Sequence, residues 1–176
     1  MSEHKSNIEA MLADLSTDKA GLHCLQESRT ILDPRLTTVY PVLFKYLADK
    51  DLSITGEPTY TENAEFITAK MYAILKTPLS DSKSVNFFKA LPHTSAINNR
   101  VNRLLQSMIS FSATADGLIQ IAYISKQADF QTSINWTNLF WQLKKMQFSL
   151  DSARQVALQW SQDYFRRNTE LKSEEN

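Results

Sequence analysis

The segment NWTNLFWQLKKMQF, Asn135 to Phe148, decides the fold class of this 176-residue chain. Its apolar residues recur at steps of three and four, the spacing that aligns side chains on one face of an α-helix. The segment therefore predicts a helix with an apolar stripe that packs into a core. That stripe is formed by Trp136, Leu139, Phe140, Leu143 and Met146. The same spacing recurs along most of the chain, so we expect an all-α protein.

Trp141 lies off this stripe, and Lys145 follows it on the same outer side of the predicted helix. Two interpretations of Trp141 are open. It packs against a neighbouring helix or domain, which is the simpler account, or it contacts a binding partner, because tryptophan is enriched at interfaces. Trp141 is therefore the candidate residue of a partner interface.

Helical periodicity continues on both sides of this segment. Near the N-terminus NIEAMLADL predicts a helix, and Asp33-Pro34 is a typical helix start, with aspartate as the cap and proline in the first turn. Pro41 is expected to break or restart that helix. Asn63 is expected to cap the helix AEFITAKMYAILK.

Two polar segments predict loops, DKDLSITGEPTYTEN at 49–63 and PLSDSKS at 78–84. We place a boundary near the second loop. The predicted organisation is an N-terminal helical region at 1–80, a C-terminal helical bundle at 81–168 and a frayed tail at 169–176.

The composition excludes most kinds of catalytic site. Cys24 is the only cysteine and the three histidines are scattered, so a cysteine-rich zinc site cannot be built and no metal site is expected. The three glycines, at 21, 56 and 117, exclude the glycine-rich loops that cradle phosphates or dinucleotides. We therefore expect no enzyme and no cofactor.

The start MSEHKSNIEA lacks the features of a signal peptide, and no apolar run is long enough for a membrane span, so we expect a cytoplasmic protein.

The net charge of zero hides an uneven distribution. Residues 1–63 carry six basic and ten acidic side chains, whereas residues 64–167 carry twelve basic and six acidic side chains. Between Lys70 and Arg103 only Asp81 opposes six bases, among them Lys89 and Arg100. Cations spaced along helix flanks can each meet a phosphate without reading sequence, so this stretch is a candidate polyanion-binding surface.

Four stretches of the second half resemble the small subunit, of the CasB family, of the type I-E CRISPR surveillance complex Cascade. They are FFKALPH, INNRVNRLLQS, NWTNLFWQL and ALQWSQDYFRR, which follow one another in the order and with the spacing typical of that family. The resemblance covers residues 85–167. The N-terminal half is similar only in GLHCLQESR followed by a proline-containing helix.

This resemblance implies a fold, a function and partners. The fold would be an N-terminal helical region joined to a C-terminal four-helix bundle, and the protein would be non-catalytic. Two copies would assemble head to tail beside the backbone and large subunits of the complex. They would contact the guide RNA, the target and the displaced DNA strand, and so stabilise the R-loop in antiviral defence.

The resemblance and the charge pattern together give the candidate nucleic-acid-binding residues. Lys89 and Arg100 match basic positions of the family, and Lys144 and Lys145 lie near a basic cluster. Arg103 and Lys70 come from the charge pattern, and Arg29 is the nearest base to the position where the family has an arginine pair, here Gln26-Glu27.

The chain also departs from the family at Asn99 and Asn135, which replace an arginine and an aspartate. The alternative hypothesis is a helical adaptor that binds only protein, through the Trp141 face.

Overall fold

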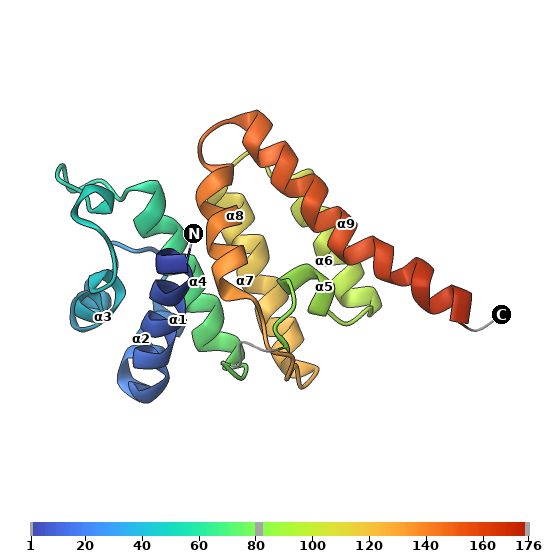
Figure 1. The fold of residues 1–176 in the computed structure, drawn as a ribbon, viewed down its shortest axis with the longest axis horizontal. Helices are drawn as coiled ribbons and strands as arrows, with labels where there is room; N and C mark the ends of the chain where they lie inside the picture. Colours follow the sequence, from blue (N-terminus) through green and yellow to red (C-terminus); the bar gives the residue numbers. More distant parts are fainter. Residues whose placement is uncertain (1, 80–82, 175–176) are drawn as a thin grey trace.

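The computed structural model describes the backbone of residues 2–79 and 83–174 and the side chains of residues 7–79 and 83–166. Within these ranges every regular element is a helix, which confirms the predicted all-α class (Figure 1). The α-helices are α1 (Ser2–Thr17), α2 (Lys19–Glu27), α3 (Tyr40–Phe44), α4 (Tyr60–Leu75), α5 (Phe87–Ala90), α6 (Ser95–Gln106), α7 (Phe111–Gln127), α8 (Trp136–Met146) and α9 (Leu150–Glu174). Two 3₁₀ helices complete the set, η1 (Pro34–Thr38) and η2 (Asp49–Asp51).

The helix starts follow the local chemistry of the chain, with one exception to our expectation. Asp33 caps η1 by accepting a hydrogen bond from the Arg35 amide, and α3 restarts with Pro41 in its first turn. The prediction that Asn63 caps α4 is wrong. Thr59 is the cap. Its hydroxyl accepts a hydrogen bond from the Glu62 backbone amide at 3.1 Å, and the Glu62 carboxylate accepts one from the Thr59 backbone amide at 2.8 Å.

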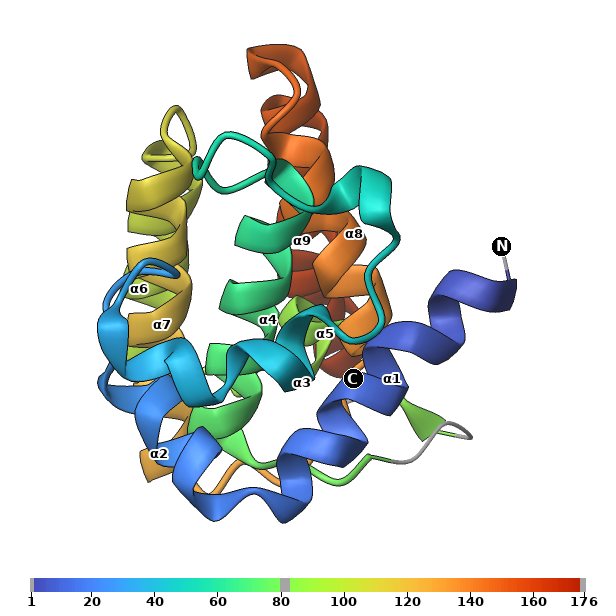
Figure 2. The ribbon, with the colours of Figure 1, turned by 90° about the vertical axis from the view of Figure 1, so that its left-hand side faces the viewer.

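Helix α4 lies at the centre of the molecule (Figure 2). All of its residues except Tyr60 and Asn63 are buried. It packs against α2 and α3 on one side and against α7 and α8 on the other. A helix that is buried all round belongs in a core, and α4 therefore joins the N-terminal helices to the C-terminal ones.

The C-terminal helices pack in sequence around this centre. α6 lies against α7, and α8 lies against α9. The apolar stripe predicted for α8 is confirmed, since its five residues are all buried. One continuous cluster of buried side chains includes residues from α1 to α9. The division at 80/81 therefore stays a prediction, and the boundary itself falls among residues 80–82, outside the described residues.

Helix α9 is the longest element and crosses the molecule diagonally (Figure 1). Its inner stripe of Ala153, Val156, Trp160 and Tyr164 is buried. The backbone remains helical to Glu174, so the helix overlaps the predicted tail at 169–176, of which residues 175–176 lie outside the described residues.

Candidate nucleic-acid interface

Helix α6 presents two arginines on an uncharged surface. Ile97, Val101 and Leu104 bury its inner side. Its exposed side chains include Asn99, Asn102, Arg103 and Gln106, and no acidic residue occurs between Ser95 and Gln106. Arg100 is half-buried, and its guanidinium donates a hydrogen bond to the Gln120 side-chain oxygen of α7. Neither arginine forms an ion pair with a carboxylate among the described residues.

Lys89 lies on the short helix α5, which is fixed to α9. Phe87, Phe88 and Ala90 are buried, so the lysine is the exposed residue of this turn. The Phe88 ring stacks on the Trp160 ring with centroids 4.7 Å apart. The Asn86 amide donates to the Asp163 carboxylate at 3.0 Å, which anchors the start of α5 to α9.

The start of α6 is held against α9 as well. The His93 ring stacks on Tyr164 with centroids 4.5 Å apart, and the Tyr164 hydroxyl donates to the Asn98 side chain. Lys89, Arg100 and Arg103 are therefore carried by elements that are joined to one another through α9 and α7. We call α5 and α6 with these three residues the α5–α6 face.

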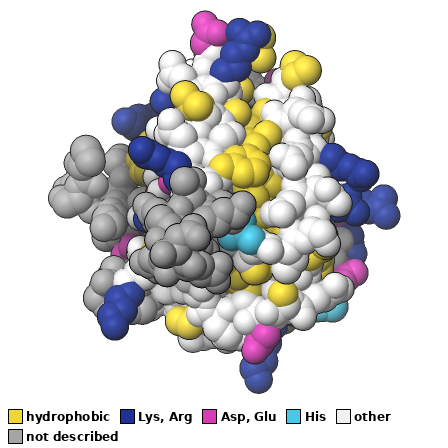
Figure 3. Space-filling view, turned by 90° about the vertical axis from the view of Figure 1, so that its right-hand side faces the viewer, with side chains coloured by type: hydrophobic (Ala, Val, Ile, Leu, Met, Phe, Trp, Pro, Cys, Tyr) yellow, Lys and Arg dark blue, Asp and Glu magenta, His cyan; other side chains and the backbone are white. Residues whose placement is uncertain are grey.

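Figure 3 shows this side of the molecule. Hydrophobic side chains form a strip across its middle, and lysine and arginine side chains lie toward its margins, separated by uncharged surface. The basic side chains visible in this view are thus spaced apart, as separate phosphate contacts along a strand would require.

The two lysines of α8 have different environments. The Lys144 ammonium lies 3.5 Å from an Asp51 carboxylate oxygen and 5.2 Å from the centroid of the Trp141 ring. Trp141 thus pairs with Lys144, one turn away. Lys145 is half-buried and forms no ion pair within the described part of the chain.

Trp141 also lines a cavity together with Asn7, Ile8 and Tyr46 of the N-terminal part of the chain. Both interpretations of Trp141 therefore stay predictions. The side chain is still 38% exposed, so part of the ring faces outward.

Lys70 has a structural role. Its side chain is 7% exposed. Its ammonium group donates hydrogen bonds to three backbone carbonyls, those of Leu25 at 3.0 Å, Gln26 at 2.7 Å and Ser28. These carbonyls end helix α2, where a positive charge is favourable. Burial lowers the pKa of Lys70. All three protons are used inside the protein, so Lys70 is not positioned to meet a phosphate.

Arg29 is exposed and follows directly after this capped end. It lies at a cavity of about 810 Å³ between the α2–η1 connection, α4 and α7. The structure therefore divides the candidate residues among three places. Lys89, Arg100 and Arg103 share the α5–α6 face, Lys144 and Lys145 lie with Trp141 on α8, and Lys70 and Arg29 lie at the end of α2.

The sequence analysis missed two residues that matter for this arrangement. Gln120, which orients Arg100, carries no signal in the sequence. Glu65 is 1% exposed, and burial raises its pKa to about 9, with the charges of Glu62 and Asp51 adding to the effect. Its burial could have been inferred, because Glu65 and Lys70 both interrupt the otherwise apolar stretch of α4.

Neither a metal site nor a membrane-spanning helix is present among the described residues. No group of three or more histidine, cysteine or acidic side chains there could hold a metal ion. No described helix is long and apolar enough to cross a membrane.

A family model for the CRISPR-associated protein Cse2 matches residues 29–165. In fold, the chain is similar to a chain of a "CRISPR RNA-guided surveillance complex", with 18% identity, a TM-score of 0.71 and coverage of 98% of both chains. It is also similar to CasB from Thermobifida fusca, with 16% identity, a TM-score of 0.58 and coverage of 92% of this chain and 94% of the other. The sequences of curated proteins give no significant match. Because the family model spans most of the sequence, and the fold agrees from end to end, the chain belongs to the CRISPR-associated Cse2 family.

Proposed function

We propose that this Cse2-family chain is the non-catalytic small subunit of a type I-E CRISPR surveillance complex, in which its α5–α6 face contacts nucleic-acid backbones and stabilises the R-loop. The observation that carries the proposal is the family match over residues 29–165. The similarity to a surveillance-complex chain over 98% of both chains supports it. The partners would be the guide RNA, the target and displaced strands, the backbone and large subunits and a second copy of the chain, in the cytoplasm.

Contact with phosphates is supported by the chemistry of α6. Its outer surface combines amide side chains with Arg103 and the half-buried Arg100, and amides and guanidinium groups are the donors that proteins use toward phosphate and sugar oxygens. Gln120 holds the Arg100 guanidinium in place, which lowers the conformational cost of a contact. Lys89 adds a third cation on the same face.

A neutral protein with a few spaced cations is expected to bind nucleic acid weakly in isolation. Inside a complex the subunit would be held next to the strands, so weak contacts become effective through a high local concentration. Base pairing to the guide would read the sequence, and this subunit would contribute contacts that do not depend on sequence.

The proposal is tested first by assembly. The tagged chain is co-expressed with the backbone and large subunits of a type I-E complex and a guide RNA, and we expect it to co-purify with them. A chain that folds but stays out of the complex would contradict the proposal. A complex that assembles, but whose R-loop is unaffected by charge reversal on the α5–α6 face, would instead support the alternative of an adaptor that binds only protein.

A further inference from the structure

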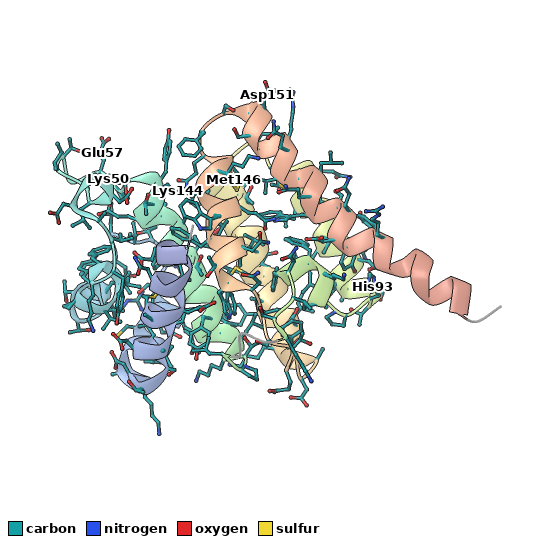
Figure 4. All side chains as sticks on the ribbon, in the orientation of Figure 1. Lys50, Glu57, His93, Lys144, Met146 and Asp151 are labelled. Carbon is teal, nitrogen blue, oxygen red and sulfur yellow. The ribbon has the colours of Figure 1, made fainter. Side chains whose placement is uncertain are left out.

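A second cavity lies on the other side of the molecule from the α5–α6 face. It has a volume of about 360 Å³ and lies between residues 45–51, α1, α4 and α8. Figure 4 places Lys50 and Lys144 on this side and His93 on the opposite side. A cavity of this size is large enough for one planar ring with a few water molecules.

Glu65 lines this cavity and is the one feature there that the fold does not explain. Its side chain is 1% exposed, and neither carboxyl oxygen has a hydrogen-bond partner among the described residues. Because its pKa is raised to about 9, the side chain is a neutral carboxylic acid at physiological pH. It therefore offers one unused donor and one unused acceptor side by side.

The polar groups next to Glu65 are already satisfied. The Thr61 hydroxyl donates to Asp51 at 3.2 Å, and Asp51 also pairs with Lys144. The Glu62 carboxylate accepts the backbone amides of Ser53 at 3.0 Å and Thr59 at 2.8 Å. A buried polar group without partners is uncommon in native proteins, and next to a cavity it indicates a ligand.

The walls of the cavity indicate what that ligand is. Phe140 and the partly exposed Trp141 supply aromatic surface. Three lysines also line the cavity: Lys45 is paired with Asp14 and Lys144 with Asp51, and Lys50 forms no ion pair among the described residues. Aromatic rings beside lysines are the combination that holds single-stranded nucleic acid, with a base on the ring and the phosphate on the cation.

We propose that this cavity receives one unpaired nucleobase from a strand that passes over α8, with the base against Trp141 and its hydrogen-bonding edge toward Glu65. The inference rests on the proposed function, since it requires a nucleic-acid strand at the subunit. It assigns Trp141 to nucleic acid and gives Lys50 and Lys144 the role of phosphate contacts.

A neutral carboxylic acid is suited to sequence-independent recognition. The Watson–Crick edge of every nucleobase has a donor next to an acceptor, and a protonated glutamate complements that pair in either order. An ionised glutamate would accept only and would discriminate among the bases. Burial of Glu65 thus makes the pocket tolerant of sequence, as a subunit in a guide-directed complex requires.

The test uses the full chain and intrinsic fluorescence. Trp141 is 38% exposed, whereas Trp136 and Trp160 are at most 3% exposed, so quenching by a stacked base reports on Trp141. A single-stranded DNA oligonucleotide and an abasic strand of equal length are titrated up to millimolar concentration. We expect the normal strand to quench the fluorescence and to bind about tenfold more tightly, the size of effect expected for one stacked base.

Two variants separate recognition from stability. Glu65→Gln keeps a donor and an acceptor, and we expect it to retain the preference for the normal strand. Glu65→Met removes both groups, and we expect it to lose most of that preference while its Tm stays equal or rises, because an unsatisfied buried polar group has been removed. Weakened binding in Glu65→Met with a lowered Tm would contradict the inference.

Other outcomes would overturn the inference without affecting the proposed function. Equal binding of normal and abasic strands by a chain that still assembles would show phosphate contacts only. Loss of assembly in Glu65→Met, with strand binding unchanged, would show that the cavity takes an amide side chain of a protein partner. Failure of the wild-type chain to assemble would contradict the proposed function itself.

Discussion

Two regions of this molecule use cationic side chains in opposite ways. At the end of α2 the Lys70 ammonium is buried and bound to three backbone carbonyls, so its charge is used to hold one helix end against α4. On α6 the Arg103 side chain is exposed and no carboxylate among the described residues pairs with it. The comparison shows that a count of charges along a segment does not give the charges available to a partner.

The largest expected effect comes from removing the buried cation. Lys70→Met leaves the carbonyls of Leu25, Gln26 and Ser28 without their donor, and we expect the free energy of unfolding to fall by about 3 kcal/mol. Arg103→Met, at an exposed site, is the matched control, and we expect it to change the free energy of unfolding by less than about 0.5 kcal/mol. Urea denaturation of both variants measures the difference. Equal losses of unfolding free energy in the two variants would show that the two cations contribute equally to stability.

The second prediction concerns Glu65, which lies on α4 as Lys70 does. The pKa of Glu65 is raised to about 9 in the folded protein from an ordinary value of 4.5, chiefly by burial. Between these values the folded chain keeps a proton that the unfolded chain has lost, so stability must fall as pH rises through this window. The slope contributed by this one group approaches about 1.4 kcal/mol per pH unit.

The measurement is urea denaturation at about pH 5 and about pH 8, where that difference in protonation is present. The side chain introduced by Glu65→Gln cannot titrate. We expect this variant to lose the fall in unfolding free energy with pH that Glu65 contributes in wild type. An identical pH dependence in both proteins would mean that Glu65 is ionised in the folded state.

A smaller loss of stability is expected where a cation is only partly buried and forms a single ion pair. Lys144→Met removes an ion pair with Asp51 and the contact with the Trp141 ring, at a side chain that is 19% exposed. We expect a loss of about 1 kcal/mol, because such pairs are partly screened by water. Lys145→Met on the next position serves as the control, with an expected change below about 0.5 kcal/mol. Thermal denaturation of the two variants at low and high salt measures the difference in stability between them.

The sequence predicted the fold class and the core stripe of α8 correctly because both depend on local periodicity. The stripe of α8 and the cap at Asp33 follow from residues a few positions apart. The start of α4 differs from the prediction because the Thr59–Glu62 capping box, whose spacing is visible in the chain, forms the cap in place of Asn63.

The candidate site was predicted less well, because the use of a charge depends on contacts between distant segments. Lys70 reaches residues more than forty positions away, and Lys144 reaches Asp51 from the other half of the chain. Neither contact leaves a local pattern. The apolar residues on both sides of Lys70 indicate that it is buried, and this is a stronger signal than the local excess of basic residues.

We propose above all that the arginines of α6 meet phosphates. The most direct test is target-DNA binding by the assembled complex across a salt series, with wild type, Arg100→Glu/Arg103→Glu and the control Lys19→Glu/Arg154→Glu, which changes charge equally elsewhere. We predict that the first variant assembles, forms a weaker R-loop and has a salt slope shallower by about 2 units, as the loss of two phosphate contacts requires. A slope and an R-loop indistinguishable from those of wild type and the control would contradict the account.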